Sequence, residues 1–332
     1  LHEGKLVINK PLTLRSYYDG NNRDYISSTI LQPTQGSTAI TISSPGVTLK
    51  GFTIEGNVSE TGIYTVFTGT DISMIKRNTL FIDNMVLNNL ARATDLWSVN
   101  VTINNTEISN ATQVNYIINS IVTATNLLYH NNSAKTIFKL TGNSNFSSCE
   151  FSYNTDQISF SSDVMLLGEL FFDSCKFEGN TIPDSQKNII DFEMFKEIDL
   201  SSCKFEKNII SSEESDLIKF IGIKYNNSIL ESTINISNCK FQDNKSEFSI
   251  PKYSHCILGL DLNNFSISNS SFISNNIGAM SMSSPNIMID RCEINNCKYD
   301  LFKFLGVENS PKIAKIELKN SSIINNEGQI YI

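Results

Sequence analysis

Basic runs and long apolar stretches are both missing from this sequence. Its 332 residues carry 26 Lys and Arg against 34 Asp and Glu, which gives a formal net charge of −8, and the charges are scattered. Without a basic patch, nucleic acid is not an expected partner. No apolar run reaches the roughly 18 residues of a membrane-spanning helix, so this segment is not expected to span a membrane.

Tryptophan occurs once, histidine three times, and alanine is scarce. In their place the chain is rich in Asn, Ser, Ile, Thr and Phe, a composition that disfavours helix and favours strands. Apolar residues make up 40% of the chain and are spread evenly, which argues against disorder and for a folded β protein.

Short segments with alternating apolar and polar residues run through the whole chain, and Asn, Gly or Ser stands at their ends. This period of two is typical of half-buried strands. We find no long segment with helical periodicity. Examples of the expected strands are residues 38–42, 47–54, 100–103, 136–140, 234–241 and 286–294.

The motif Cys-x-Phe-x-x-Asn recurs at 149–154, 175–180, 203–208 and 239–244, and looser copies extend it in both directions. Repeats about 20 to 36 residues apart indicate a solenoid. Variable spacing with a constant strand motif predicts an all-β, right-handed parallel β-helix of about 11–12 coils. We expect one domain over residues 1–332. Because both ends read as strands without a cap, we expect it to be a segment of a longer chain or of a stacked assembly.

Two stretches near the N-terminus, "LVINKPLTLRS" and "TAITISSPGVTLKGFTIEGN", resemble the opening coils of the pectate-lyase-type β-helix superfamily. The Phe-x-x-Asn copies resemble those of chlamydial polymorphic membrane proteins and related protist surface proteins. A second motif of that family, Gly-Gly-Ala-aliphatic, is reduced to "IGAM" at 277–280. The resemblance covers the chain and implies the fold. For function it implies either polysaccharide processing or a carbohydrate-binding or adhesive role.

In a β-helix, equivalent residues of successive coils lie about 4.8 Å apart. The cysteine and the phenylalanine of the motif share the inner side, so each should stack in a ladder. We expect the asparagine to lie at the corner, with left-handed backbone and with amide bonds to the coils above and below. The predicted members are Phe151, Phe177, Phe205 and Phe241; Asn154, Asn180, Asn208 and Asn244; and Cys149, Cys175, Cys203, Cys239 and Cys292.

The cysteines do not predict a metal or cofactor site. Their shortest separation, Cys292 to Cys297, lacks a Cys-x-x-Cys pattern and has no histidine beside it. Buried thiols that pack as small apolar groups are one interpretation. Disulfides between neighbouring coils are another, because the coil spacing lies within the permitted Cα range.

No catalytic residues are predicted. Asp173 and Asp199 should lie at nearby places in successive coils, but the other acidic residues look scattered and solvated. A cluster of three or more charged side chains in one outer groove would favour chemistry. Tyr17, Tyr18, Tyr64, Trp97 and Tyr116 could contact sugars, although nothing in the sequence groups them.

Asn-x-Ser/Thr sites are frequent, and the best candidates for N-glycosylation are Asn226, Asn145 and Asn110. Asn57, Asn131 and Asn244 occupy the expected corner position instead. We expect a non-enzymatic structural or adhesive segment of a secreted or cell-surface protein, in a filament or a large multidomain assembly. Its expected partners are other copies or domains, stacked or laterally associated, and glycans. The alternative is a polysaccharide-binding or polysaccharide-degrading β-helix.

Overall fold

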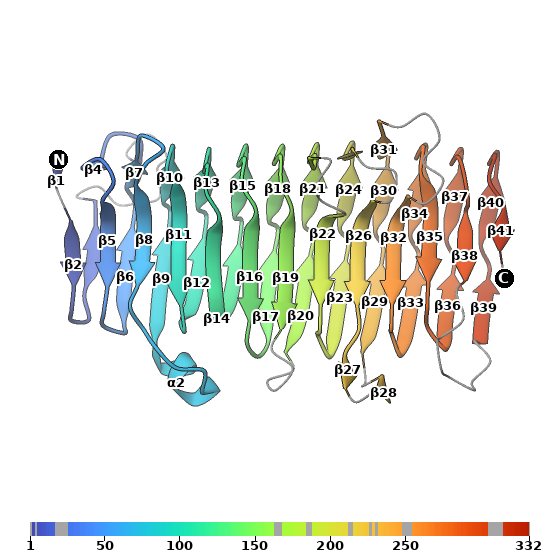
Figure 1. Ribbon diagram of the computed structural model, residues 1–332, viewed down its shortest axis with the longest axis horizontal. Coiled ribbons are helices and arrows are strands. Elements are labelled where there is room, and N and C mark those ends of the chain that lie inside the picture. The colour runs from blue at the N-terminus through green and yellow to red at the C-terminus, as the bar shows by residue number, and fades with distance from the viewer. Residues whose placement is uncertain are drawn as a thin grey trace. The chain divides into compact units, whose positions relative to one another are not determined.

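The computed structural model describes residues 2–3, 5–16, 26–162, 168–183, 188–211, 215–225, 228–229, 232–247, 254–304 and 315–331. They belong to two compact units, Leu1–Asn154 and Thr155–Ile332. In each unit the strands of successive coils lie side by side and pair in parallel (Figure 1). The predicted all-β, right-handed parallel β-helix is confirmed.

The first unit repeats three strand positions, which we call sheets 1, 2 and 3 in the order in which the chain passes through them. β14 (Asn115–Thr125) runs through sheets 1 and 2, with a register shift between Ile118 and Ser120. Sheet 1 also contains β2 (Leu6–Ile8), β5 (Thr38–Ile42), β8 (Thr61–Thr65), β11 (Arg92–Trp97) and β16 (Thr136–Leu140). Sheet 2 contains β3 (Thr13–Arg15), β6 (Val47–Lys50), β9 (Thr79–Asp83), β12 (Asn100–Asn104) and β17 (Ser144–Ser147). Sheet 3 contains β1 (His2–Glu3), β4 (Ile30–Pro33), β7 (Thr53–Glu55), β10 (Val86–Asn88), β13 (Glu107–Ser109), β15 (Leu128–His130) and β18 (Glu150–Ser152).

The second unit repeats the same three positions. Sheet 1 contains β19 (Ile158–Ser162), β22 (Asn188–Glu193), β26 (Asp216–Ile221), β32 (His255–Leu260), β35 (Gly278–Met282), β38 (Phe302–Phe304) and β41 (Ile330–Tyr331). Sheet 2 contains β20 (Glu169–Asp173), β23 (Glu197–Ser201), β29 (Thr233–Ser237), β33 (Asn264–Ser268), β36 (Asn286–Asp290) and β39 (Lys315–Lys319). Sheet 3 contains β21 (Lys176–Glu178), β24 (Lys204–Glu206), β30 (Lys240–Gln242), β34 (Ser271–Ile273), β37 (Glu293–Asn295) and β40 (Ser322–Ile324).

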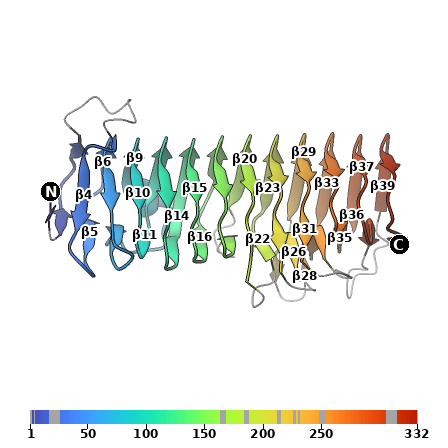
Figure 2. The same cartoon turned by 90° about the horizontal axis from the view of Figure 1, so that it is seen from above.

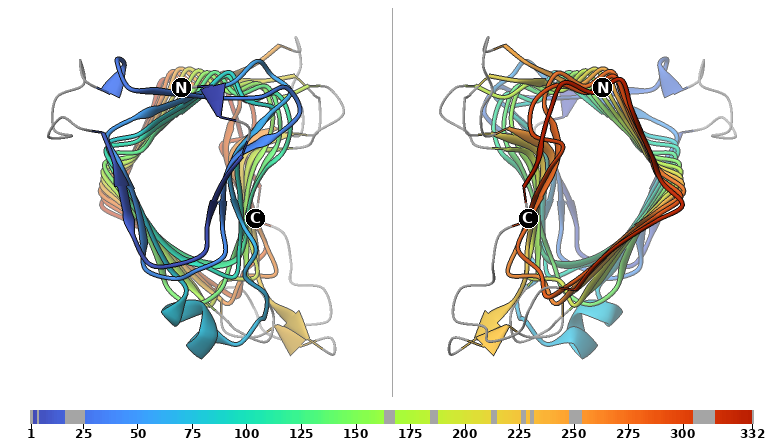
Figure 3. Two further views of the ribbon diagram at one scale, coloured as in Figure 1. Left: turned by 90° about the vertical axis from the view of Figure 1, so that its left-hand side faces the viewer. Right: turned by 90° about the vertical axis from the view of Figure 1, so that its right-hand side faces the viewer.

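A few elements lie outside these sheets. In the first unit, helix α2 (Ile72–Arg77) projects from the connection between β8 and β9 (Figures 1 and 3). Asp71 caps this helix by accepting a hydrogen bond of 2.7 Å from the backbone N–H of Ser73. In the second unit, β25 (Ile209–Ile210) pairs with β31 (Lys245–Ser246), and β27 (Lys224–Tyr225) forms a hairpin with β28 (Ser228–Ile229). Among the described residues, no helix has the length and apolar character that crossing a bilayer requires.

The connection from sheet 2 to sheet 3 is a tight turn in every coil from β6 onward. Its first residue has positive φ, as in Asn84, Ser202 (φ 55°) and Asn320. Asn and Ser are common here because short polar side chains tolerate the left-handed region. The second turn residue, such as Cys203, points inward and is buried. The ladder cysteines therefore sit at this corner, just before the strand that carries the phenylalanine.

Aromatic rings pack against one another among the aliphatic side chains of the interior. In the second unit, Phe177, Phe205, Phe241 and Phe272 form a continuous stack with centroid separations of 5.0, 4.8 and 4.6 Å and nearly parallel planes. The spacing matches the distance between neighbouring strands. In the first unit Phe151 packs against Tyr129 and Phe146. The phenylalanine position of the motif is thus an inner, fully buried position in both units.

The asparagine of the motif is buried beside this stack. Asn208 donates from Nδ2 to Asn244 Oδ1 (2.9 Å) in the next coil and to the carbonyl of Phe177 (3.0 Å) in the preceding one. Its own Oδ1 accepts from the backbone N–H and the Nδ2 of Asn180. Every hydrogen-bonding group of this buried amide is therefore matched, as burial of polar atoms requires.

Three details differ from the sequence expectation. The left-handed residue is the one before the ladder asparagine, such as Lys207 (φ 57°), because that is where the backbone reverses. In the coil of β15 the ladder member is Asn132, whereas Asn131 is exposed. Asn57 is also exposed, so it does not continue the ladder.

Replacing Asn208 by Ala should destabilise the protein, because Asn180 and Phe177 would keep buried polar groups without partners. Each such group costs about 1–3 kcal/mol. We therefore expect a clear drop in the urea midpoint of the Asn208→Ala variant. The matched control is Asn145→Ala on the exposed side of β17, which should stay near the wild-type midpoint. Equal midpoints for the two variants would contradict the structural role of the ladder.

Candidate functional site on the outer faces of the strands

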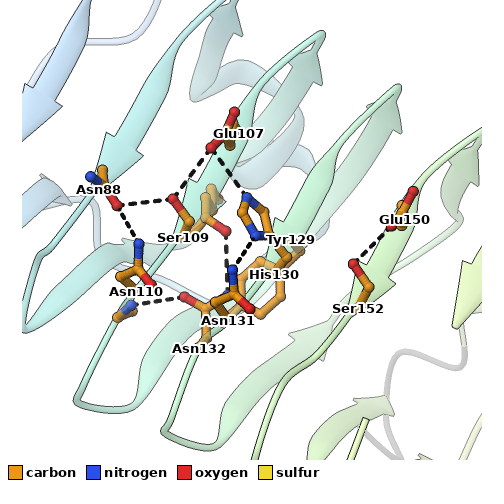
Figure 4. Close-up of polar contacts among 12 residues, drawn as sticks. Asn88, Glu107, Ser109, Asn110, Tyr129, His130, Asn131, Asn132, Glu150 and Ser152 are labelled. Carbon is orange, nitrogen blue, oxygen red and sulfur yellow. Dashed lines mark hydrogen bonds and ion pairs between the residues drawn. The ribbon is translucent and has the colours of Figure 1, made fainter. Parts of the chain in front are cut away.

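The outer face of sheet 3 in the first unit carries a polar network around His130, drawn in Figure 4. His130 on β15 lies opposite Ser109 on the neighbouring strand β13. The Nε2 atom of His130 is 3.1 Å from Oε1 of Glu107, and Nδ2 of Asn131 is 2.8 Å from Nδ1 of His130. Alternation along the strand places these groups outward, while Ile108 and Tyr129 point into the core.

These contacts engage both ring nitrogens of His130. Nε2 is within hydrogen-bonding distance of the Glu107 carboxylate, and Nδ1 is within hydrogen-bonding distance of the Asn131 amide. Neither ring nitrogen is hydrogen-bonded to a hydroxyl group of the described residues, as the base that activates a hydroxyl nucleophile would be.

The network continues into the preceding coils. Ser109 Oγ and Asn110 Nδ2 both donate to Asn88 Oδ1, at 3.0 and 2.7 Å, and Asn88 Nδ2 donates to the carboxylate of Glu55. The hydroxyls of this face therefore bond to amide and carboxylate oxygens. This arrangement rigidifies the face rather than activating a hydroxyl group.

In the second unit the outer face of sheet 3 is held by ion pairs. Glu178 contacts the ammonium groups of Lys176 and Lys207, the latter at 2.8 Å, and Lys240 lies 3.6 Å from Glu206. Hydrogen bonds from Lys176 and then from Lys207 hold the pKa of Glu178 below its ordinary value. These glutamates are ion-pair partners of lysines on their own or neighbouring coils.

Figure 2 shows the sheet 2 strands β20, β23, β29 and β33 side by side. Carboxylates gather on the outer face of β20 and β23 in this second unit. Nδ2 of Asn235 donates to both Glu197 Oε1 (3.1 Å) and Asp199 Oδ1 (2.8 Å). Partial burial, then the charges of Asp199 and Glu169, raise the pKa of Glu197. Asp173 does not face Asp199: Phe171 is the residue opposite Asp199, and Asp173 lies two residues farther along β20, opposite Ser201. Glu169, Glu197 and Asp199 form the cluster of charges that would favour chemistry.

Sheet 1 of the first unit brings together aromatic side chains that the sequence does not group. Asp95 on β11 lies opposite Tyr64 on one side and Tyr116 on the other. Trp97, two residues after Asp95, has its ring 6.5 Å from that of Tyr116. The sequence does not reveal this grouping, because connections of unequal length separate β8, β11 and β14. We call Tyr64, Arg92, Asp95, Trp97 and Tyr116 the aromatic platform.

The structure places all seven cysteines in the interior, each as a thiol rather than half of a disulfide. Hydrogen bonds to the thiols of Cys175 and Cys239, and then burial, raise the pKa of Cys203 above its ordinary value. In the same corner, Ser270 takes the cysteine's place, and its hydroxyl accepts from the backbone N–H of Cys239. No group of three or more His, Cys, Asp or Glu among the described residues is arranged to hold a metal ion.

The glycosylation candidates have different surroundings. Asn145 is exposed on the outer side of β17, and Asn110 is exposed in a turn with its amide bonded to Asn88. Asn244 is buried in the ladder. Asn226 lies outside the described residues, as do Tyr17 and Tyr18.

We predict that none of the seven thiols reacts with a maleimide in the folded protein, because all are buried and thiolate formation at Cys203 is disfavoured. After unfolding in denaturant without reductant, all seven should be labelled. Mass spectrometry counts the adducts. Fewer than seven after unfolding would support disulfides between coils.

Glu197→Gln and Glu178→Gln should change stability in opposite directions at pH 7. The raised pKa of Glu197 means that its contribution to stability is lost as pH rises through that pKa, so removing the charge should stabilise at pH 7. The lowered pKa of Glu178 means that its contribution is present at pH 7 and is lost as pH falls through that pKa.

Urea midpoints of both variants at pH 7 and pH 3 test this pair. The urea midpoint of Glu197→Gln should be higher than that of wild type at pH 7 and close to it at pH 3. The urea midpoint of Glu178→Gln should be lower than that of wild type at pH 7, and the difference should be smaller at pH 3. The same sign for both variants at pH 7 would refute the assignment.

No protein-family model matches the chain, and a search of curated protein sequences gives no match either. Among solved structures, the chain is similar to the A-modules of the mannuronan C-5 epimerases AlgE4 and AlgE6 of Azotobacter vinelandii. Identities are 9% and 11%, TM-scores are 0.45 and 0.34, and the coverage is 98% of this chain with 88% and 90% of theirs. It is also similar to the surface protein and adhesin PfbA of Streptococcus pneumoniae, at 9% identity and TM-score 0.37 over 98% of this chain and 90% of that one. The order and parallel pairing of the strands make this chain a right-handed parallel β-helix.

Proposed function

We propose that the chain is a non-enzymatic structural and adhesive β-helix segment of a secreted or cell-surface protein. The observation that carries this proposal is the set of hydrogen bonds that the outer polar side chains form. Around His130 they bond to one another, and both ring nitrogens are occupied by Glu107 and Asn131. A network of this kind stiffens the surface and leaves no activated nucleophile at its centre.

The interior supports the same proposal. Stacked phenylalanines and the fully bonded asparagine ladder tie each coil to the next, so neighbouring coils resist separation. Connections such as the one bearing α2 vary while the strands repeat, which lets the chain present different surfaces on a constant frame. The proposed partners are other copies or domains, stacked or laterally associated, and glycans. Assembly into a filament or a large extracellular chain follows from the same proposal.

A second candidate function is polysaccharide processing, and one observation favours it. Glu197 and Asp199 share the amide of Asn235, and the pKa of Glu197 is raised. General acid and base catalysis on a glycosidic bond uses a pair of carboxyl groups, and Glu197 and Asp199 form such a pair around one amide. Several proteins of similar fold act on such polymers, among them a GH87 α-1,3-glucanase of Streptomyces thermodiastaticus and the alginate lyase AlyGC.

Incubating the purified chain with alginate, pectate and α-1,3-glucan distinguishes the two functions. We expect no new reducing ends and no unsaturated products, together with retention of the chain on intact cell-surface material. Asp199→Asn serves as the control variant, since the amide retains the acceptor that Asn235 needs. Product formation that disappears in Asp199→Asn would overturn the non-enzymatic proposal in favour of the second candidate.

A further inference from the structure

The aromatic platform is held in one arrangement by its own hydrogen bonds. Nε1 of Trp97 donates to Asp95 Oδ1 at 2.6 Å, and the backbone N–H of Trp97 donates to Thr65 Oγ1 at 2.7 Å. The indole edge is therefore fixed, and residue Trp97 is still 37% exposed. A ring that is fixed before a ligand arrives loses little conformational freedom on binding.

Arg92 is fixed in the same way. Nη1 of Arg92 lies 2.7 Å from Asp95 Oδ2, Nε donates to the carbonyl of Val114 at 2.8 Å, and the guanidinium carbon lies 4.8 Å from the ring centroid of Tyr116. The Arg92 and Asp95 side chains are 26% and 13% exposed. Their charges cancel, so the platform has polar character without a net charge.

The hydrogen-bonding groups that remain available on the platform define the chemistry of its ligand. The phenol hydroxyls of Tyr64 and Tyr116 form no hydrogen bond with any described residue, although each can donate and accept. They lie on the two strands on either side of Asp95, and the ring of Tyr116 is 6.5 Å from that of Trp97, tilted by 42°. The platform therefore offers exposed aromatic rings with hydrogen-bonding groups at their side.

We propose that the aromatic platform binds a neutral pyranose residue of a polysaccharide. A pyranose has one face of C–H groups, which packs on an aromatic ring, and hydroxyls at its rim, which pair with phenol hydroxyls and a guanidinium group. An acidic sugar would bring a charge that the Arg92–Asp95 pair does not balance, and the chain as a whole is negative. This inference rests on the proposed adhesive function and assigns its glycan-binding surface to sheet 1 of the first unit.

Trp97 is the only tryptophan of the chain, so its fluorescence reports on this platform alone. Titration of the whole chain with soluble neutral polysaccharides (a β-1,3-glucan, a mannan and a galactan) should shift and intensify the emission with at least one of them. Alginate and pectate at the same concentration should cause a smaller change. No response to any of the three neutral polymers, or a stronger response to the acidic ones, would overturn the proposal.

Calorimetric titration with the best neutral polymer then tests individual side chains. Trp97→Ala should weaken binding at least tenfold, and Tyr116→Phe, which removes one hydroxyl, should weaken it severalfold. The matched control is Phe81→Ala on sheet 2 of the same unit, a residue that is 44% exposed, and this variant should bind like wild type. Circular dichroism establishes that each variant is folded.

The outcomes separate this inference from the proposed function. If Trp97→Ala binds both the polymer and cell-surface material as well as wild type, the platform is not the glycan site and adhesion resides elsewhere. If wild type retains neither polymer nor cell-surface material, the inference and the adhesive function both fail. Retention on cell-surface protein alone, with no polysaccharide response, would leave adhesion standing and overturn the platform's assignment to a sugar.

Discussion

A buried asparagine side chain has two donor hydrogens and an acceptor oxygen, and all of them need partners. In this chain the partners are provided by the coils on either side: Asn208 bonds to Asn180, to Asn244 and to the carbonyl of Phe177. Leaving such groups unpaired in the interior is costly, so a coil can join the stack only in the register that aligns the asparagines. The parallel phenylalanine rings follow from the same alignment, because Phe205 and Phe241 are directly opposite in neighbouring strands.

Much of this could be inferred from the sequence, because the determinants are local and repeated. A six-residue motif encodes the inward cysteine, the inward phenylalanine and the bonded asparagine. The left-handed residue could not be located, since Lys207, Asp243 and Ser274 share no side-chain type. Near β15 the sequence motif places the ladder asparagine one residue too early, at Asn131 instead of Asn132. In this coil Tyr129 takes the place of phenylalanine, and its hydroxyl accepts a hydrogen bond from the Asn115 amide. Contacts between outer side chains are harder to predict from the sequence, because they depend on which residues of different coils become neighbours.

The outer faces show how neighbours set the behaviour of identical side chains. Glu178 lies between two lysines and keeps its charge readily, whereas Glu197 lies beside Asp199 and Glu169 and holds its proton more strongly. Neither difference is visible in a single strand. Cysteine likewise takes its meaning from position: at the inner corner Cys203 and Cys239 donate weakly to the carbonyls of Ser201 and Ser237, and Ser270 donates to Ser268 in the same manner. In the first unit the same inner corner also holds Phe52, Met85 and Leu127, so the position requires a buried side chain and not sulfur chemistry.

The tight turn between sheets 2 and 3 has a consequence for how such a chain can change over generations. From β6 onward it contains one left-handed residue and one inward residue, so an inserted amino acid would turn the inner side chains of the following strand outward. The other two connections tolerate different lengths, and one of them accommodates α2. Genetic insertions, and loops grafted by an engineer, should therefore accumulate at two of the three corners, while the third stays constant in length.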